Sequence, residues 1–295
     1  MRISLLALIW GSGFLLIKIA LRGFSPVQLT FSRLALGALV LLIFVALTRL
    51  RLPANGRTWL HLFVAALLAN AIPYTLFGVA ERHVDSNLAG AINATTPLWT
   101  VLFALATGTE SRLTARRWLG MLLGFAGALV ILSPWNTSLV PLGYALACLA
   151  ASASYGASYV YMARYLIGQG LSPLVLSASQ LIAASGLLIL ATPFGGLDTP
   201  HWRFDAVVGL LALGAVGTGI AYVLNYRIIS DDGPVLASTV TYLIPLVAVV
   251  VGALFLKEDL TPTLIAGTAV VLAGVALTRQ ETSPAVARTA PASSK

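Results

Sequence analysis

Long apolar stretches follow one another along almost the whole chain, separated by short polar or turn-rich breaks. A helix needs about 20 apolar residues to cross roughly 30 Å of hydrocarbon, and ten stretches of about that length can be marked off. They lie at 2–21, 27–48, 59–80, 86–107, 115–132, 140–164, 173–193, 206–228, 234–256 and 262–278. The pattern predicts an all-α integral membrane protein with ten transmembrane helices.

Composition supports this class and argues against the soluble ones. Hydrophobic residues make up 58% of the chain and charged residues only 9%, whereas about one-quarter of a soluble domain is charged. The net charge of +8 is spread over short loops, so the clustered basic patch that nucleic-acid binding requires is not expected. The first apolar stretch could be a secretory signal peptide, but Lys18 interrupts the region where cleavage would occur. We interpret it as the first span.

Basic residues are distributed unequally between alternate loops. With a cytoplasmic N-terminus, 12 of the 18 Lys and Arg residues lie on the cytoplasmic side, five lie on the outer side, and Arg33 lies within a span. Because positive charge is retained in the cytoplasm, both termini are predicted to be cytoplasmic in a bacterial inner membrane. The tail at 279–295 lacks apolar periodicity and is predicted to be disordered.

The second half of the chain repeats the first. A shift of 148 positions places Pro97 on Pro245 and Glu110 on Glu258, and after a one-residue slip Gly120 and Gly127 fall on Gly267 and Gly274. Near the start of each half, Trp10-Gly11 recurs as Tyr155-Gly156 and Ser25-Pro26 as Ser172-Pro173. Each unit holds five spans, an odd number, so the second must enter the membrane from the opposite side. Two inverted five-helix repeats are therefore predicted, an arrangement that many secondary transporters use for alternating access.

The paired motifs resemble a known family. Glu110 with the following Leu113-Thr114 and Gly120, and Glu258 with Leu260-Thr261 and Gly267, are similar to the paired motif of the drug/metabolite transporter superfamily, whose ten-helix members carry two EamA-type domains. The resemblance implies one EamA-type repeat at 1–133 and another at 139–278. Within the family, the chain is similar to the YddG-like exporters of aromatic and other amino acids.

Polar and aromatic side chains recur on matched helix faces. Asn70, Tyr74 and Phe77 share one face of the third span, and Thr218, Tyr222 and Asn225 share the equivalent face of the eighth. Together with similar positions elsewhere inside the spans, they are predicted to line a central cavity formed by helices one, three, four, six, eight and nine. The predicted substrate-binding residues are Trp10, Ser12, Asn70, Tyr74, Phe77, Asn93, Tyr155, Tyr159, Thr218, Tyr222, Asn225 and Thr241.

Each of these residues also has a structural interpretation. Asn and Thr often bridge neighbouring membrane helices, and a proline or glycine within a span often serves packing rather than a functional bend. Arg33, whose repeat equivalent is Gln180, could pair with a substrate carboxylate, but structural pairing with Glu81 or Asp85 is the preferred interpretation. Gly120 and Gly124 are expected to pack helices within the chain rather than to form a dimer.

The carboxylates indicate how transport would be driven. All ten map to loops or helix ends, whereas proton-coupled transporters generally place an acid within the membrane. We therefore expect a facilitative exporter of small metabolites, amino acids including aromatic ones, with Gly11, Gly156 and the prolines accommodating the bends. A proton-coupled exporter of drugs or other metabolites is the alternative. No ATP-binding, metal-binding or catalytic motif is evident, so a membrane-embedded enzyme is disfavoured and neither a cofactor nor a metal is predicted. The expected partners are the substrate and membrane lipid, with a monomer preferred over a dimer.

Overall fold

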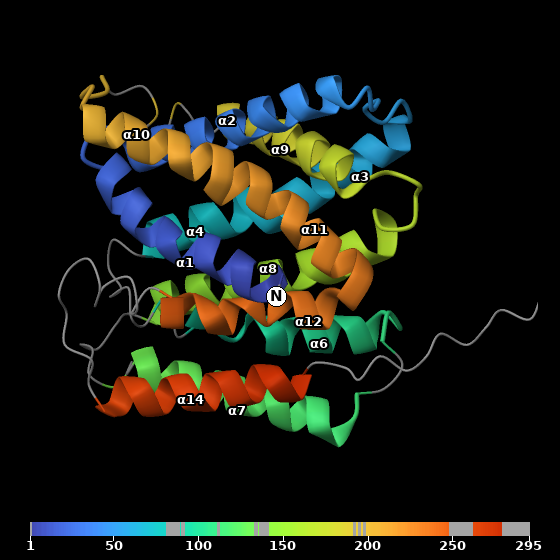
Figure 1. The fold of residues 1–295 in the computed structure, drawn as a ribbon, viewed down its shortest axis with the longest axis vertical. Helices are drawn as coiled ribbons and strands as arrows, with labels where there is room; N and C mark the ends of the chain where they lie inside the picture. Colours follow the sequence, from blue (N-terminus) through green and yellow to red (C-terminus); the bar gives the residue numbers. More distant parts are fainter. Residues whose placement is uncertain are drawn as a thin grey trace, which may run out of the picture.

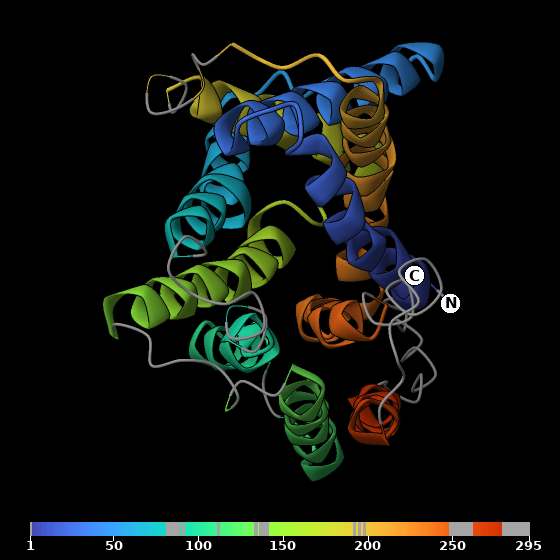
Figure 2. The same cartoon turned by 90° about the vertical axis from the view of Figure 1, so that its left-hand side faces the viewer.

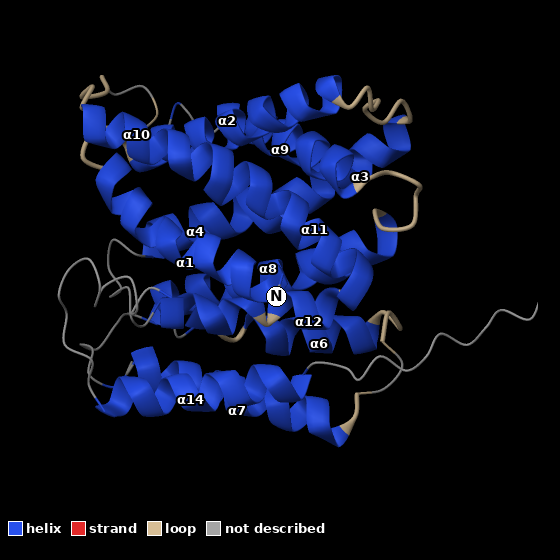
Figure 3. Cartoon of the chain, viewed as in Figure 1, coloured by secondary structure: helices blue, strands red, loops and turns tan. Residues whose placement is uncertain are grey.

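A computed structural model describes residues 2–80, 89, 92–110, 113–132, 135, 142–190, 193, 196, 199–247 and 262–278. In the part of the chain that it describes, every regular element is helical (Figure 3). The predicted tail at 279–295 lies outside the described residues, as do Glu81, Asp85 and Glu258.

The described helices lie where spans were predicted, and parts of the fourth and ninth predicted spans lie outside the described residues. The first half contains α1 (Arg2–Ala20), α2 (Pro26–Leu47), α3 (Gly56–Ala66), η1 (Leu67–Ala71), α4 (Ile72–Ala80), α6 (Thr96–Ala106) and α7 (Ala115–Leu132). The second half contains α8 (Leu142–Tyr165), α9 (Pro173–Ile189), α10 (Phe204–Ala212), η4 (Leu213–Ile220), α11 (Ala221–Asp232), α12 (Pro234–Ser238), a helical run at 240–247, and α14 (Pro262–Thr278).

Three of the described helical runs are both long and apolar enough to cross a membrane. They are Pro26–Leu47, Gly56–Phe77 and Phe204–Asp232. Shorter apolar helices include Thr96–Ala106, Pro173–Ile189 and Pro234–Val247. The sequence pattern treated the fourth and ninth spans as continuous, but the structure places a turn at residues 94–95 in the fourth and at Thr239 in the ninth.

The same local signal starts the second helix of each half. Ser25 caps α2 and its hydroxyl accepts a hydrogen bond from the Gln28 amide at 3.3 Å, while Ser172 caps α9 and accepts from the Val175 amide at 3.3 Å. A proline follows each cap at the first helical position, where its missing N–H costs nothing. The repeated Ser-Pro pair therefore sets the same helix boundary twice.

Elements from the two halves occupy corresponding places. Figure 2 shows α4 and α8 on one side, α1 and α10 on the other, and α6 beside α12. Two further pairs close the ends: α2 packs on α9, and α7 packs on α14 as a separate layer at the bottom of Figure 1. The position of α7 and α14 agrees with the expectation that the fifth and tenth spans lie away from the centre.

Glycines hold that outer pair together within the chain. A Cβ atom at Gly120 would lie 2.7 Å from the Gly274 carbonyl oxygen, and one at Gly127 would lie 2.8 Å from the Gly267 carbonyl oxygen. Such spacing requires glycine, since small residues let membrane helices approach closely. Gly124 packs against the ring of Tyr242 in the same way, so these glycines are packing residues within one chain, as predicted.

Candidate functional site

Two short π-helical segments lie at matched places in the two halves. A shift of 148 moves residues 67–71 of η1 to 215–219, which lie inside η4. In η1 the Ile72 amide bonds to the Leu67 carbonyl, and the next amide in this register would belong to Pro73, which has none. The Leu68 carbonyl instead accepts a hydrogen bond from the Ser154 hydroxyl of α8 at 2.8 Å. π-Helical turns often occur at functional sites, and Asn70 and Thr218 each lie in one.

Asn70 lies at the centre of a buried chain of hydrogen bonds. Its amide nitrogen donates to the Tyr222 hydroxyl, and its oxygen accepts from Nε2 of Gln180 at 3.1 Å. The Gln180 oxygen accepts in turn from the Tyr226 hydroxyl. All four side chains are buried, so each bond forms where water does not compete for the polar groups.

A second polar pair stands at the matched position. Nε of Arg33 on α2 donates to the Thr218 hydroxyl at 3.1 Å, and that hydroxyl donates to the Leu213 carbonyl at 3.0 Å. The Arg33 guanidinium lies 5.5 Å from the centre of the Tyr74 ring, a cation–π distance. Gln180 binds Asn70 in the same manner as Arg33 binds Thr218, from the second helix of one half to the π segment of the other.

Aromatic residues from four helices meet beside these polar groups. The Trp10 and Tyr222 rings pack edge to face at 6.5 Å, and the Phe77 and Tyr155 rings stack at 6.2 Å. The hydroxyls of Tyr74 and Tyr155 both interact electrostatically with that of Tyr222. We define the central cluster as the residues that these contacts join: Trp10, Arg33, Asn70, Tyr74, Phe77, Tyr155, Gln180, Thr218, Tyr222 and Tyr226.

The cluster has closed and open parts. Asn70, Thr218 and Tyr222 are buried, whereas Trp10 and Tyr74 keep part of their surface accessible. Phe77, Tyr155 and Arg33 are also half-buried. The arrangement can therefore offer aromatic faces and one cation to a ligand, with the buried amides holding the helices in place.

Other predicted site residues make local contacts that do not join them to the cluster. Ser12 donates to the Leu8 carbonyl at 2.6 Å, and Thr241 donates to the Ser238 carbonyl at 2.9 Å. Asn93 accepts from the Thr96 hydroxyl at 3.3 Å. Tyr159 is the exception, because it is buried in the apolar cluster that also contains Tyr226 and against which Trp10 packs. Ser12, Asn93 and Thr241 thus have the local hydrogen bonds expected of structural residues.

Asn225 differs from them because one of its polar atoms is unsatisfied. Its side chain is only 3% exposed, and its oxygen accepts no hydrogen bond from the described residues. Buried carbonyl groups normally have a donor. Asn225 lies one turn of helix beyond Tyr222, so it extends the face predicted from the sequence without joining the hydrogen-bond chain.

The predicted set of binding residues lacks three members of the cluster. Gln180 and Tyr226 were not among the predicted binding residues, and Arg33 was assigned a structural pairing with Glu81 or Asp85. Both carboxylates lie outside the described residues. The repeat that matches Gln180 to Arg33 was the available signal, while Tyr226 could have been found one helical turn after Tyr222.

The matched glycines of α1 and α8 lie where these helices pack closely on the other half of the chain. A Cβ at Gly11 would lie 2.5 Å from Cβ of Val247, and a Cβ at Gly156 would lie 2.6 Å from Cβ of Trp99. Val247 follows Trp99 by 148 positions, so the two contacts are equivalent. Both helices run without interruption through these positions. The glycines allow close helix packing, and that they accommodate bends during transport stays a prediction.

The described carboxylates lie at helix ends, as predicted. Glu110 follows α6 and pairs with Arg117 at 3.4 Å, Asp205 lies in the first turn of α10, and Asp231 ends α11 beside Arg2. None of these acids contacts the central cluster. His83, Glu81 and Asp85, considered for coupling or for pairing with Arg33, lie outside the described residues.

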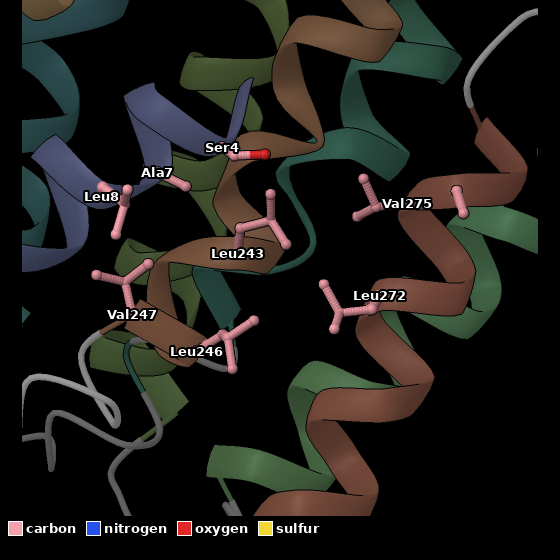
Figure 4. Close-up of a pocket in the computed structure, with 9 residues that line it drawn as sticks. Ser4, Ala7, Leu8, Leu243, Leu246, Val247, Leu272 and Val275 are labelled. Carbon is pink, nitrogen blue, oxygen red and sulfur yellow. The ribbon is translucent and has the colours of Figure 1, made fainter. Parts of the chain in front are cut away.

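An apolar cleft of about 400 Å³ opens between α1, residues 240–247 and α14 (Figure 4). Figure 4 shows Leu243 and Leu246 facing Leu272 and Val275 across it. Its lining includes no residue of the central cluster, so it is a separate feature beside the outer helix pair.

Comparisons with known proteins agree with this architecture. The model of the EamA-like transporter family matches residues 2–133 and again residues 142–280. The uncharacterized inner membrane transporter YedA of Escherichia coli K12 is 31% identical over 251 residues, 84% of this chain and 79% of that protein. The uncharacterized transporter YdfC of Bacillus subtilis is 26% identical over 275 residues, 93% of this chain and 89% of that protein. A protein of known crystal structure, 20% identical, has the same fold, with a TM-score of 0.81 and coverage of 94% of this chain and 96% of its own.

Proposed function

Because the chain belongs to the EamA-like transporter family of the drug/metabolite transporter superfamily, we propose that it exports small metabolites, amino acids with aromatic side chains among them, through the central cluster. The family and the named relatives are membrane transporters, so the chain is a transporter and not an enzyme. The observation that carries the substrate proposal is the meeting of Trp10, Tyr74, Tyr155 and Tyr222 beside a cation. Rings of this kind bind flat apolar side chains.

The proposed mechanism is alternating access between two inverted five-helix repeats. Matched contacts support it: Gly11 with Val247 corresponds to Gly156 with Trp99, and Arg33 with Thr218 corresponds to Gln180 with Asn70. Each of these contacts joins one half to the other. Rocking of the halves would therefore act directly on the cluster, as in transporters that bind substrate at a repeat interface.

The proposed orientation has both termini in the cytoplasm. Arg2 pairs with Asp231 and Thr58 bonds to Gln169, so these helix ends lie together, while Arg22 pairs with Asp205 at the other end. The helix ends of the first two pairs belong to the side on which most basic residues were predicted from the sequence, which is the cytoplasmic side. An alkaline phosphatase fused after Arg279 should be inactive, and periplasmic activity would reverse the assignment.

Transport should be facilitative, because the described carboxylates stand at helix ends rather than in the cluster. An amino acid that is concentrated in the cytoplasm leaves down its own gradient and needs no coupling group. The test is counterflow of labelled amino acids in proteoliposomes, with and without an imposed pH gradient. Flux that requires the gradient would favour the alternative, a proton-coupled exporter of drugs or other metabolites.

Two substitutions connect this flux to the cluster. Tyr74→Ala removes a half-buried ring, and Tyr222→Phe removes a hydroxyl that accepts from Asn70; both should lower counterflow at least severalfold. Tyr165→Ala is the control, since this partly exposed tyrosine lies at the end of α8 outside the cluster. Equal flux in all three variants, at equal recovery of folded protein, would remove the cluster from the transport path.

A further inference from the structure

Arg33 is the one basic side chain that the described contacts place in the central cluster. It enters from α2, where sequence patterning alone suggested a residue held by a nearby carboxylate. Its partners in the described part of the chain are the Thr218 hydroxyl, through Nε, and the face of the Tyr74 ring. Neither partner carries a negative charge.

The two terminal nitrogens of Arg33 remain available. Among the described residues, no acceptor binds Nη1 or Nη2. Both atoms keep accessible surface, since neither is among the buried polar atoms that lack a partner. The side chain is half-buried, so these nitrogens face accessible space. Thr218 and Tyr74 fix the guanidinium at its inner edge and its face, and its outer edge presents two parallel donors.

A cation in this position favours the binding of an anion. Placing an arginine within a membrane protein is costly, and such residues normally face a wet cavity or pair with opposite charge. The guanidinium fork matches a carboxylate in two parallel hydrogen bonds, which a lysine cannot reproduce. The matched residue in the other half, Gln180, is neutral and has both polar groups occupied by Asn70 and Tyr226.

We propose that Arg33 binds the carboxylate of the transported substrate, so that the site selects carboxylates with an aromatic or apolar body and rejects the corresponding amines. This inference rests on the proposed function and deepens it. The carboxylate occupies the open edge of the guanidinium, and the rings of Trp10 and Tyr155 contact the apolar body. An amine without a carboxylate meets an uncompensated positive charge.

The first test uses the wild-type protein in proteoliposomes, with labelled L-phenylalanine as the counterflow substrate. Two competitors share its ring and differ in charge: 3-phenylpropionate carries only the carboxylate, and phenethylamine carries only the amine. Competition by 3-phenylpropionate and not by phenethylamine is expected. Competition by phenethylamine at equal or lower concentration would overturn the inference.

The second test replaces the cation. Arg33→Gln, which installs the residue found at the matched position, should raise the KM for L-phenylalanine about 10-fold or more, the loss expected for a charge-assisted pair of hydrogen bonds. It should also abolish competition by 3-phenylpropionate, whereas Arg33→Lys restores part of it. Arg22→Gln, which removes an exposed arginine paired with Asp205 at the helix end, is the matched control and leaves KM unchanged.

Two further measurements distinguish a failure of the Arg33 inference from a failure of the amino acid proposal on which it rests. If L-phenylalanine is not carried, the amino acid proposal fails, and the Arg33 inference is then judged by whether 3-phenylpropionate raises the melting temperature of purified wild-type protein but not of Arg33→Gln. If it raises neither, Arg33 is not a carboxylate site. If Glu81→Gln or Asp85→Asn reproduces the transport defect of Arg33→Gln, Arg33 serves a structural ion pair and the inference is wrong.

Discussion

Arg33 and Gln180 occupy the same place in the two halves and differ in what they leave free. Gln180 is buried, with its nitrogen bonded to Asn70 and its oxygen bonded to Tyr226. Arg33 is half-buried and uses one nitrogen for Thr218. The same cross-repeat contact is therefore closed and neutral on one side and open and charged on the other. The two halves share this contact, but Gln180 with Asn70 holds helices together, whereas Arg33 with Thr218 keeps donors available to a ligand.

The π segments show the opposite case, in which different side chains produce the same backbone. In η1, Pro73 lacks an amide and the Ser154 hydroxyl bonds to the exposed Leu68 carbonyl. In η4 the proline position is Ala221, whose amide is present and donates to the Val216 carbonyl, the equivalent of the Leu68 carbonyl. The widened turn is thus common to both halves, although the groups that satisfy it are not.

The largest loss of stability is expected at the matched glycines of α1 and α8, where the two halves make equivalent contacts. Gly11→Leu and Gly156→Leu should each destabilise the protein by roughly 3 kcal/mol or more, because overpacking forces the helices apart. Both contacts have backbone or Cβ atoms as neighbours, which cannot move aside. The measurement is the yield of monodisperse protein and its melting temperature in detergent. Gly13→Ala, whose Cβ would meet Leu213 at an ordinary 3.5 Å, is the control. If Gly156→Leu left the melting temperature unchanged while Gly11→Leu lowered it, the two contacts would not be equivalent.

An intermediate loss of stability should distinguish Gln180, whose polar groups are both bonded, from Arg33, which has free donors. Gln180→Leu leaves the Asn70 oxygen and the Tyr226 hydroxyl without partners, at a cost of about 1–3 kcal/mol for each buried group. The melting temperature should fall clearly, whereas Arg33→Gln should change it little. Ser185→Ala on the same helix controls for general effects, since that hydroxyl bonds only to the Leu181 carbonyl. Equal destabilisation by Arg33→Gln and Gln180→Leu would show that Arg33 is also a structural residue.

The smallest effect concerns the hydroxyl that compensates for Pro73. Ser154→Ala should cost about 0.6 kcal/mol, the average for a hydrogen bond between membrane helices. In a Pro73→Ala background the cost should shrink, because an alanine amide at that position can bond within the helix. A double-mutant cycle on melting free energies measures the coupling. Additive effects would mean that the Ser154 hydroxyl does not compensate for the amide that Pro73 lacks.

Much of the helical architecture can be derived from the sequence because it depends on local features. Apolar length sets the spans, and the predicted fifth and tenth spans coincide with α7 and α14. The Ser-Pro pairs at residues 25–26 and 172–173 fix helix starts through a cap and a pre-set dihedral angle. The faces of Asn70 with Tyr74 and of Thr218 with Tyr222 were likewise readable from helical periodicity.

Which polar groups meet was decided only by tertiary packing. Ser12, Asn93 and Thr241 look equivalent to Asn70 and Thr218 in a linear sequence, yet the first three bond locally and the last two bond across the halves. Gln180 and Asn70 are 110 positions apart, and Arg33 and Thr218 are 185 apart. Periodicity specifies the face on which a side chain lies but not the helix that will lie opposite. The partner, and with it the difference between a satisfied amide and an open guanidinium, is set when the helices pack.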